Sequence, residues 1–351
     1  MTITLKDLAK SLNLSVSTVN AALHNRSDIS HSTRQRVQKM AREMNYRPNL
    51  VARSLVTRRT HVLGVIVPDL SRSFFTEVTN GVDAVSSSAG YNLLLCNTGE
   101  GAAREEEGLA TLAGKQVDGL IIASAYPPGS SKIQEQLTQY GIPFVFIDRF
   151  FPKVPFVGGD DVRIGYLATQ HLIGQGYRNV AHLRGPNVST ALGRLKGYLT
   201  ALSEHGIEPR DDYIIEAQYH EESSSLEAMR ALLRVSPRPD AIFAASDPIA
   251  IGALEALRQV GLQVPQDIGI VGVGNHRYGE YLRVPLTTID QNRQEIGQKA
   301  ASLLLELVEG NATKKRQVIL IEPRLIVRES SLRRDKDIYP RKSASHAAVR
   351  V

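Results

Sequence analysis

The chain has 351 residues, 42% of them hydrophobic, which is enough to bury the cores of two or three domains. It has no apolar run long enough to cross a bilayer, and its first residues, MTITLKDLAK, lack the apolar segment of a secretory signal, so we expect a cytoplasmic protein. Its single cysteine, Cys96, excludes intrachain disulfides and cysteine-based zinc sites.

Positive charge is concentrated at the N-terminal end of the chain. The first 60 residues contain 11 Lys or Arg against 3 acidic residues, a net charge of +8, so the rest of the chain carries −2 of the overall +6. A basic end on a slightly acidic body is typical of a nucleic-acid-binding head attached to a domain with another task.

The first 46 residues predict three short amphipathic helices with a common core. The first follows the N-cap Thr4, the second follows Ser15, and the third follows Ser30 or Ser32. Inward-facing residues recur at helical spacing in each of them. These residues are Leu5, Leu8, Ala9 and Leu12, then Thr18, Val19, Ala22 and Leu23, then Val37, Met40, Ala41 and Met44. The pattern predicts a helix-turn-helix, and the alternative is an ordinary helical hairpin with a basic, solvated face.

The second helix is the predicted recognition helix, because it follows a short turn and its outward side carries small residues. Advancing about 100° per residue places Val16, Ser17, Asn20 and Ala21 on that side. Ser17 can hydrogen-bond several bases, whereas Val16 and Ala21 can only pack against groups such as the thymine methyl. We predict Val16, Ser17 and Ala21 as base contacts.

Residues 47–60 predict a hinge that folds on DNA. Asn49 suits an N-cap, and the eight or so helix-compatible residues that follow are too few for a stable helix alone in water. On DNA, Arg53 would lie near phosphates and Leu55 would wedge into the minor groove. Without a partner the segment would be a basic linker. The candidate DNA-binding residues are Thr4, Ser15, Val16, Ser17, Thr18, Asn20, Ala21, Asn25, Ser30, Arg34, Tyr46, Asn49, Ala52, Arg53 and Leu55.

From His61 onward, short β-branched runs alternate with helical patterns, which predicts βαβ units around parallel sheets. The runs are VLGVIV, YNLLLC, DGLIIAS, PFVFID, NVAHL, DAIFAAS and IGIVGVG. Their number requires two sheets. Ligands of such sheets bind beyond the carboxyl ends of the strands, so we expect a site formed by the residues that follow these runs.

Several motifs, in order, resemble the lactose and galactose repressor (LacI/GalR) family as far as Ser330. They are LKDLAKSLNLSVSTVNAAL, TRQRV, YRPNLVARSL, VLGVIVPDLSRSFFTEVTNGV, DGLIIAS, IPFVFIDR, GRLKGY, PLTTIDQ and LIVRES. The resemblance implies an α/β fold with a helix-turn-helix head and a body like type I periplasmic binding proteins. It also implies a nucleoid-associated repressor that binds a pseudo-palindromic double-stranded operator as a homodimer. Asn20 and Ala21 depart from the family, which usually has Ser and often a longer side chain there.

The resemblance also implies the domain boundaries. We expect a head at 1–46, a hinge at 47–60 and a body at 61–332. The body divides into one subdomain of 61–160 plus 291–322 and another of 161–290 plus 323–332. Residues 333–351 lack the leucine heptads of tetrameric relatives and predict a disordered basic tail, which favours a dimer.

By the same resemblance, an effector lies between the two subdomains. Phe74 would form a wall, Arg194 would be the cleft arginine and Tyr219 would stack, while Val273 and Gly274 replace an aromatic residue and an Asp. The candidate effector-binding residues are Ser71, Ser73, Phe74, Ser124, Asp148, Arg149, Arg194, Tyr219, Ser246, Asp247, Asn275 and Gln291.

Arg194 with Asp247 suits the paired hydroxyls of a sugar or sugar derivative. Because Arg72 and Arg149 would also be near and position 274 carries no acid, a sugar acid or phosphorylated sugar is favoured slightly. The alternative for Arg149 is a surface or hinge ion pair with its neighbour Asp148.

Other classes of protein fit the sequence less well. The adjacent Asp160 and Asp161 would point apart, no phosphate-binding GK[ST] occurs, and the nine His lack metal-ligand spacing, so we expect no catalysis, cofactor or metal. A solute-binding receptor would need an export signal and no head. A sugar-processing enzyme would turn over its ligand.

Overall fold

The computed structural model describes residues 3–46, 54, 59–127, 130–219, 222–311, 313 and 317–333. Two compact units, residues 1–60 and 61–351, make up the chain, and we call them the head and the body. Within the described ranges, no helix is both long and apolar enough to cross a membrane.

Residues 3–46 of the head form a bundle of three helices. They are α1 (Leu5–Leu12), α2 (Val16–Leu23) and α3 (His31–Glu43). The predicted caps are confirmed: Thr4 and Asp7 form a capping box on α1, Ser15 caps α2, and Ser30 rather than Ser32 caps α3. The core contains the predicted apolar stripes, with Leu8, Val19 and Val37 fully buried.

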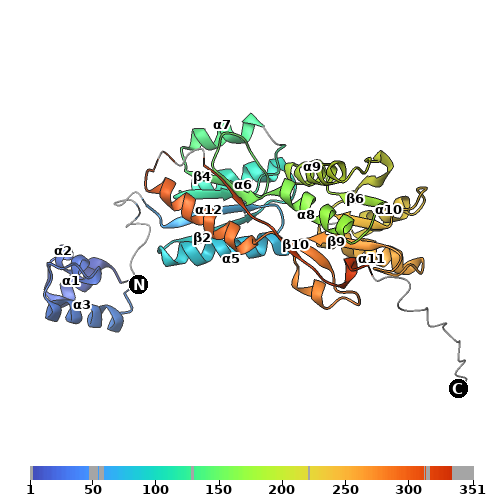
Figure 1. Ribbon diagram of the computed structural model, residues 1–351. Coiled ribbons are helices and arrows are strands. Elements are labelled where there is room, and N and C mark those ends of the chain that lie inside the picture. The colour runs from blue at the N-terminus through green and yellow to red at the C-terminus, as the bar shows by residue number, and fades with distance from the viewer. Residues whose placement is uncertain are drawn as a thin grey trace, which may run out of the picture. The chain divides into compact units, whose positions relative to one another are not determined.

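The body has two lobes, each a six-stranded sheet between helices (Figure 1). The sheet of the first lobe has the strand order β11-β5-β4-β3-β1-β2 and is parallel throughout. Its strands are β1 (Val62–Val67), β2 (Asn92–Asn97), β3 (Gly119–Ile122), β4 (Phe144–Ile147), β5 (Phe156–Gly159) and β11 (Val318–Ile321). Its helices are α5 (Ser73–Ser88), α6 (Ala102–Gly114), α7 (Ser131–Tyr140) and α12 (Arg293–Val308).

The sheet of the second lobe has the order β12-β10-β9-β8-β6-β7. Its strands are β6 (Val180–Arg184), β7 (Ile214–Glu216), β8 (Ala241–Ala244), β9 (Gly269–Val273), β10 (Thr287–Asp290) and β12 (Arg324–Ile326). Its helices are α8 (Asp161–Gly174), α9 (Ser189–Glu204), α10 (Glu222–Leu232) and α11 (Asp247–Gln259). All of its strand pairs are parallel except β10 with β12. The prediction of two parallel-dominated sheets is confirmed.

Each sheet of the body has a hydrophobic core on both faces, because successive residues of a strand point to opposite sides. In β1, Leu63 and Val65 pack with α5 and α12, whereas Ile66 packs on the other face with residues of α6 and α7. In the second lobe, α8 and α9 cover one face and α10 and α11 the other. Such burial explains why the strands are continuous apolar runs.

The chain passes between the lobes three times, from β5 to α8, from β10 to α12 and from β11 to β12. These crossings join the two sheets near their adjacent edges. They position the carboxyl ends of the central strands of both lobes around a common space.

Candidate functional site

The outward side of α2 is open in the head. Val16 is 41% exposed, and Ser17 and Asn20 are exposed as well. Ala21 is only 7% exposed, so the prediction that it lies on the open side is wrong. It lies next to the inward residues Thr18 and Ala22, and the chain that follows α2 turns back so that Arg26 N bonds to the Ala21 carbonyl.

The other polar candidates in the head hold its local structure. The Ser15 hydroxyl accepts from Thr18 N at 3.1 Å and lies 2.8 Å from the Thr18 and Ser17 hydroxyls. Asn25, at a φ of 56°, accepts from Gln38 Nε2 at 2.9 Å. Arg34 donates to the carbonyl oxygens of Arg26 and Ile29, at 2.8 and 3.2 Å, and is half-buried rather than fully solvated.

Two further candidates lie at the edges of the helices, and the hinge candidates cannot be placed. Ser30 accepts from Thr33 N at 3.3 Å, and Tyr46 packs against the head core. Asn49, Ala52, Arg53 and Leu55 lie outside the described residues, as does the predicted tail beyond position 333.

A cleft of about 680 Å³ lies between the two lobes of the body. Its walls come from the residues that follow β1, β4, β7, β8, β9 and β10 and from the first turns of α5, α9 and α11. The lining residues are Asp69, Ser71, Arg72, Ser73, Phe74, Phe75, Asp148, Arg149, Val188, Thr190, Arg194, Gln218, Tyr219, Ser225, Ser246, Pro248, Ile251, Val273, Gly274, His276, Tyr278 and Gln291.

The cleft brings together nine of the twelve candidate effector residues. They are Ser71, Ser73, Phe74, Asp148, Arg149, Arg194, Tyr219, Ser246 and Gln291. Ser124, Asp247 and Asn275 do not line it. Ser124 is fully buried behind the wall, where its hydroxyl donates to Glu105 Oε1 at 2.7 Å and its carbonyl accepts from Arg149 Nη1 at 3.0 Å.

Asp247 and Asn275 are turned away from the cleft by hydrogen bonds. Asp247 is fully buried and accepts from the main chain and the ring of His276 and from the Thr288 hydroxyl. The Asn275 amide donates to Asp290 Oδ2 at 3.1 Å and accepts from Arg328 Nη2 at 2.8 Å. Both side chains therefore support the wall.

In the first lobe, the cleft arginines are paired with carboxylates. Arg149 Nη2 and Arg72 Nη2 bind the two oxygens of Glu100, at 2.6 and 2.8 Å. Arg149 Nε also lies 3.9 Å from Asp148 Oδ2, and the two side chains are 6% and 16% exposed. The alternative of an ion pair between these neighbours is therefore confirmed, but the pair is buried and does not lie at the surface. Arg72 also lies 3.4 Å from Asp69.

Arg194 is the corresponding cation of the second lobe. Its Nε donates to Asp161 Oδ1 at 2.9 Å and its Nη1 to the Ala245 carbonyl at 2.6 Å. No hydrogen bond of its Nη2 to another described residue is present. Asp160 caps α8 instead, so the expectation that Asp160 and Asp161 point apart is confirmed.

Burial changes the charge balance of the cleft. It raises the pKa of Asp161 to about 7, against the opposing effect of Arg194. Burial also raises the pKa of Asp148, which Arg149, Arg194 and Arg72 oppose. Both carboxyls therefore hold protons more readily than exposed aspartates do.

Comparisons with known sequences identify the family. Residues 4–49 match the family described as bacterial regulatory proteins, lacI family, and residues 60–329 match periplasmic binding proteins and sugar binding domain of LacI family. The chain belongs to the LacI family. It is a DNA-binding transcriptional regulator with an effector-binding body, and relatives such as the ribose operon repressors are regulators rather than enzymes.

Three proteins illustrate the similarity. The ribose operon repressor of Haemophilus influenzae is 36% identical over 331 residues, which cover 93% of this chain and 98% of the relative. A lac repressor dimer bound to operator and an anti-inducer has a TM-score of 0.85 at 26% identity and covers 95% and 100% of the two chains. A LacI family regulator from Enterococcus faecium with bound ribose has a TM-score of 0.68 at 30% identity and covers 77% and 98%.

Further residues complete the cleft of this LacI family regulator. His276 follows β9, where the sequence predicts part of the site, and its ring lines the cleft. The sequence did not single out Thr190, Gln218, Ser225 and Tyr278, which also line it. The position after a strand could have indicated Gln218, which follows β7 by two residues. Thr190 and Ser225 lie on helices, where no such signal exists.

Proposed function

We propose that the cleft binds a neutral sugar and that this binding changes the affinity of the head for its operator. The observation that carries the proposal is a cleft with donors and acceptors from both lobes, in which each arginine is already paired with a carboxylate. Vicinal hydroxyls each donate and accept, so a sugar can use such a mixture.

The charge balance favours a neutral ligand over the sugar acid that the sequence favoured slightly. Three guanidinium groups, on Arg72, Arg149 and Arg194, contact Glu100, Asp69, Asp148 or Asp161. A carboxylate ligand would compete with these partners and would lie near Asp69 and Asp148, which also line the cleft. We expect a neutral aldose to bind more tightly than its aldonate.

We propose that the head uses Val16, Ser17 and Asn20 to contact bases of a pseudo-palindromic operator, with the hinge at 47–60 folding in the minor groove. A single head makes few contacts, and a two-fold dimer doubles them. The regulator would work in the cytoplasm, bound to the nucleoid.

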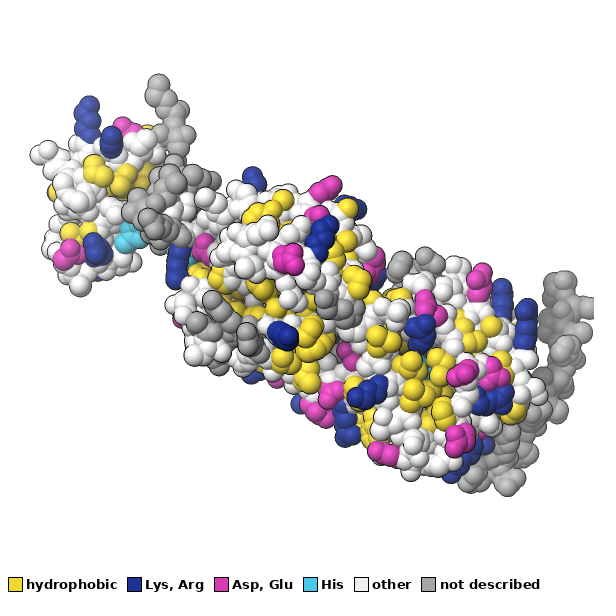
Figure 2. Space-filling model, turned by 90° about the horizontal axis from the view of Figure 1, so that it is seen from above, with side chains coloured by type: hydrophobic (Ala, Val, Ile, Leu, Met, Phe, Trp, Pro, Cys, Tyr) yellow, Lys and Arg dark blue, Asp and Glu magenta, His cyan; other side chains and the backbone are white. Residues whose placement is uncertain are grey.

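The dimer would join the bodies, with subdomains at 61–160 plus 291–322 and 161–290 plus 323–332. In support, edge strand β2 leaves Leu94 and Leu95 36% and 42% exposed. Figure 2 shows hydrophobic side chains gathered on the body surface among charged ones.

A thermal-shift and calorimetry screen of the full chain tests the ligand class, with D-ribose, D-glucose and D-galactose against their aldonates and phosphates. A ligand at about 100 times its Kd stabilises the folded state by roughly 2.7 kcal/mol. The proposal predicts binding of a neutral sugar and weaker binding of its aldonate. Tighter binding of the acid, or no binding of any sugar, would contradict it.

A further inference from the structure

One corner of the cleft is shaped by a glycine and a histidine. Gly274 follows β9 at a φ of +134°, a conformation that side chains rarely adopt. A Cβ at position 274 would lie 2.6 Å from both Cε1 and Nδ1 of His276. The imidazole therefore occupies the space that a side chain at 274 would need, and it lines the cleft there.

The orientation of the His276 ring is fixed by Asp247. His276 Nδ1 lies 3.0 Å from Asp247 Oδ2, and His276 N donates to the same oxygen at 2.8 Å. The Thr288 hydroxyl donates to Asp247 Oδ1 at 2.6 Å, and the carboxyl group is fully buried. A carboxylate can only accept, so the neutral form of the ring must carry its proton on Nδ1 and its lone pair on Nε2.

The other groups at this corner are mostly apolar. Val273, Pro248 and Ile251 line the cleft with His276, and the Tyr278 ring lies 5.2 Å from the imidazole at an angle of 34°. The side chain of His276 is 11% exposed, so a ligand here meets the ring in a largely dry environment. Besides the hydroxyls of Ser246 and Tyr278, Nε2 can serve as an acceptor for a polar ligand group at this corner.

We infer that His276 is a specificity-determining residue, whose Nε2 accepts a hydrogen bond from one hydroxyl of the sugar. The inference rests on the proposed function and assigns a residue of the cleft to one atom of its ligand. It follows that the site discriminates against the deoxy sugar that lacks this hydroxyl. A ligand without the donor would leave Nε2 unpaired in a dry corner.

Two variants of the full chain separate the roles of the two ring nitrogens. His276→Asn keeps a donor toward Asp247 and removes the acceptor, whereas His276→Gln places an amide where Nε2 lies. We expect calorimetry with the tightest-binding neutral sugar of the panel, beginning with D-ribose, to show binding weakened on the order of tenfold in His276→Asn. His276→Gln should recover most of the affinity, and His276→Asn, which keeps the donor toward Asp247, should keep the unliganded melting temperature.

Monodeoxy analogues of that sugar identify the hydroxyl. One analogue should bind the wild type about tenfold more weakly than the parent sugar does. The same analogue should bind His276→Asn as well as it binds the wild type, because the hydrogen bond to Nε2 is already missing. Equal sugar affinity of the wild type and His276→Asn would overturn the inference and leave the proposed function standing.

Nitrogen NMR of the histidine side chains in the unliganded full chain supplies a test that needs no sugar. The signals that disappear in His276→Asn should show a proton on Nδ1 and none on Nε2. A proton on Nε2, in the opposite tautomer or in a doubly protonated ring, would overturn the inference. Absence of binding by every sugar in the panel would overturn the proposed function, and the inference with it.

Discussion

Gly165 of α8 lies against the main chain of Arg194 in α9, so closely that a Cβ at position 165 would be 2.0 Å from the Arg194 carbonyl oxygen. The same holds for Gly197 of α9, where an added Cβ would be 2.0 Å from the Val162 carbonyl oxygen of α8. The two glycines allow α8 and α9 to approach closely enough for Asp161, at the start of α8, to pair with Arg194. The position of the cleft arginine therefore depends on residues that have no side chain.

Replacement of Gly165 by Ala should separate the two helices. The added methyl group would meet backbone atoms, which cannot move as a side chain tip can, so we expect a loss of about 1–3 kcal/mol or more of stability and weaker sugar binding. Gly174→Ala is the matched control, because a Cβ at this end of α8 meets nothing within 4 Å. Urea unfolding of both variants checks the prediction, and equal stability would refute it.

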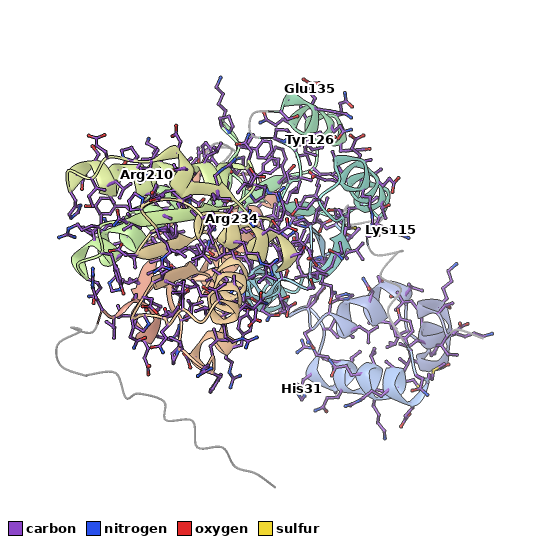
Figure 3. All side chains as sticks on the ribbon, turned by 90° about the vertical axis from the view of Figure 1, so that its right-hand side faces the viewer. His31, Lys115, Tyr126, Glu135, Arg210 and Arg234 are labelled. Carbon is purple, nitrogen blue, oxygen red and sulfur yellow. The ribbon has the colours of Figure 1, made fainter. Side chains whose placement is uncertain are left out.

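Replacement of Arg194 by Ala should weaken the response to sugar. The charge-assisted hydrogen bonds of a guanidinium contribute roughly 1.5–3 kcal/mol, so we expect about 10- to 150-fold weaker sugar binding and unchanged operator binding without sugar. Arg234→Ala is the control, because Arg234 is an exposed arginine of the second lobe, labelled in Figure 3. Calorimetry measures the sugar affinity of both variants. Full sugar affinity in Arg194→Ala would show that Arg194 does not bind the sugar.

Replacement of Val16 by Ser should weaken operator binding without changing the fold of the head. Val16 is 41% exposed at the first position of α2, so we expect its removal to cost the proposed contact with the operator and no core packing. A base contact contributes about 1–3 kcal/mol of discrimination, and we expect that loss on the operator and none on random DNA. Fluorescence anisotropy at fixed salt measures the affinity of both proteins for both DNAs. An equal loss of affinity for the operator and for random DNA would make Val16 a nonspecific contact.

His182 should make stability depend on pH. It is fully buried beside the ring of Phe243, and burial lowers its pKa to about 3 from 6.5. Between these values the unfolded chain binds a proton that the folded chain does not. The free energy of unfolding should therefore fall as pH decreases below 6.5, by about 2 kcal/mol at pH 5. Urea titrations of the wild type and His182→Phe at pH 7.5 and 5 measure this loss of unfolding free energy. His182→Phe should lose about 2 kcal/mol less between the two pH values. The same pH dependence in both proteins would contradict the prediction.

The head could be predicted from sequence almost to the residue, because its structure is local. Thr4, Ser15 and Ser30 cap helices in the way that their spacing indicates. Ala21 was misplaced because its angle on α2 lies at the border of the open side, where the chain that follows the helix decides burial.

The cleft could be predicted only in outline. The rule that ligands bind at strand ends located Ser71, Arg149 and Ser246 correctly on its walls. It could not tell that Asp247 turns inward, because that orientation is set by Thr288 and His276, which lie 41 and 29 positions away in the chain. The pairing of each cleft arginine with a carboxylate is likewise a tertiary contact, and without it the sequence favoured an anionic ligand.

The central claim is that a sugar in the cleft controls the head, and operator affinity with and without sugar tests it most directly. An operator selected from random duplexes by the full chain would be titrated by fluorescence anisotropy, with sugar at a concentration that calorimetry shows to be saturating. The account predicts a change of about 5- to 150-fold in operator Kd for the wild type. For Arg194→Ala, it predicts that about 10- to 150-fold more sugar is needed for the same change. The same Kd for the wild type with and without saturating sugar would contradict it.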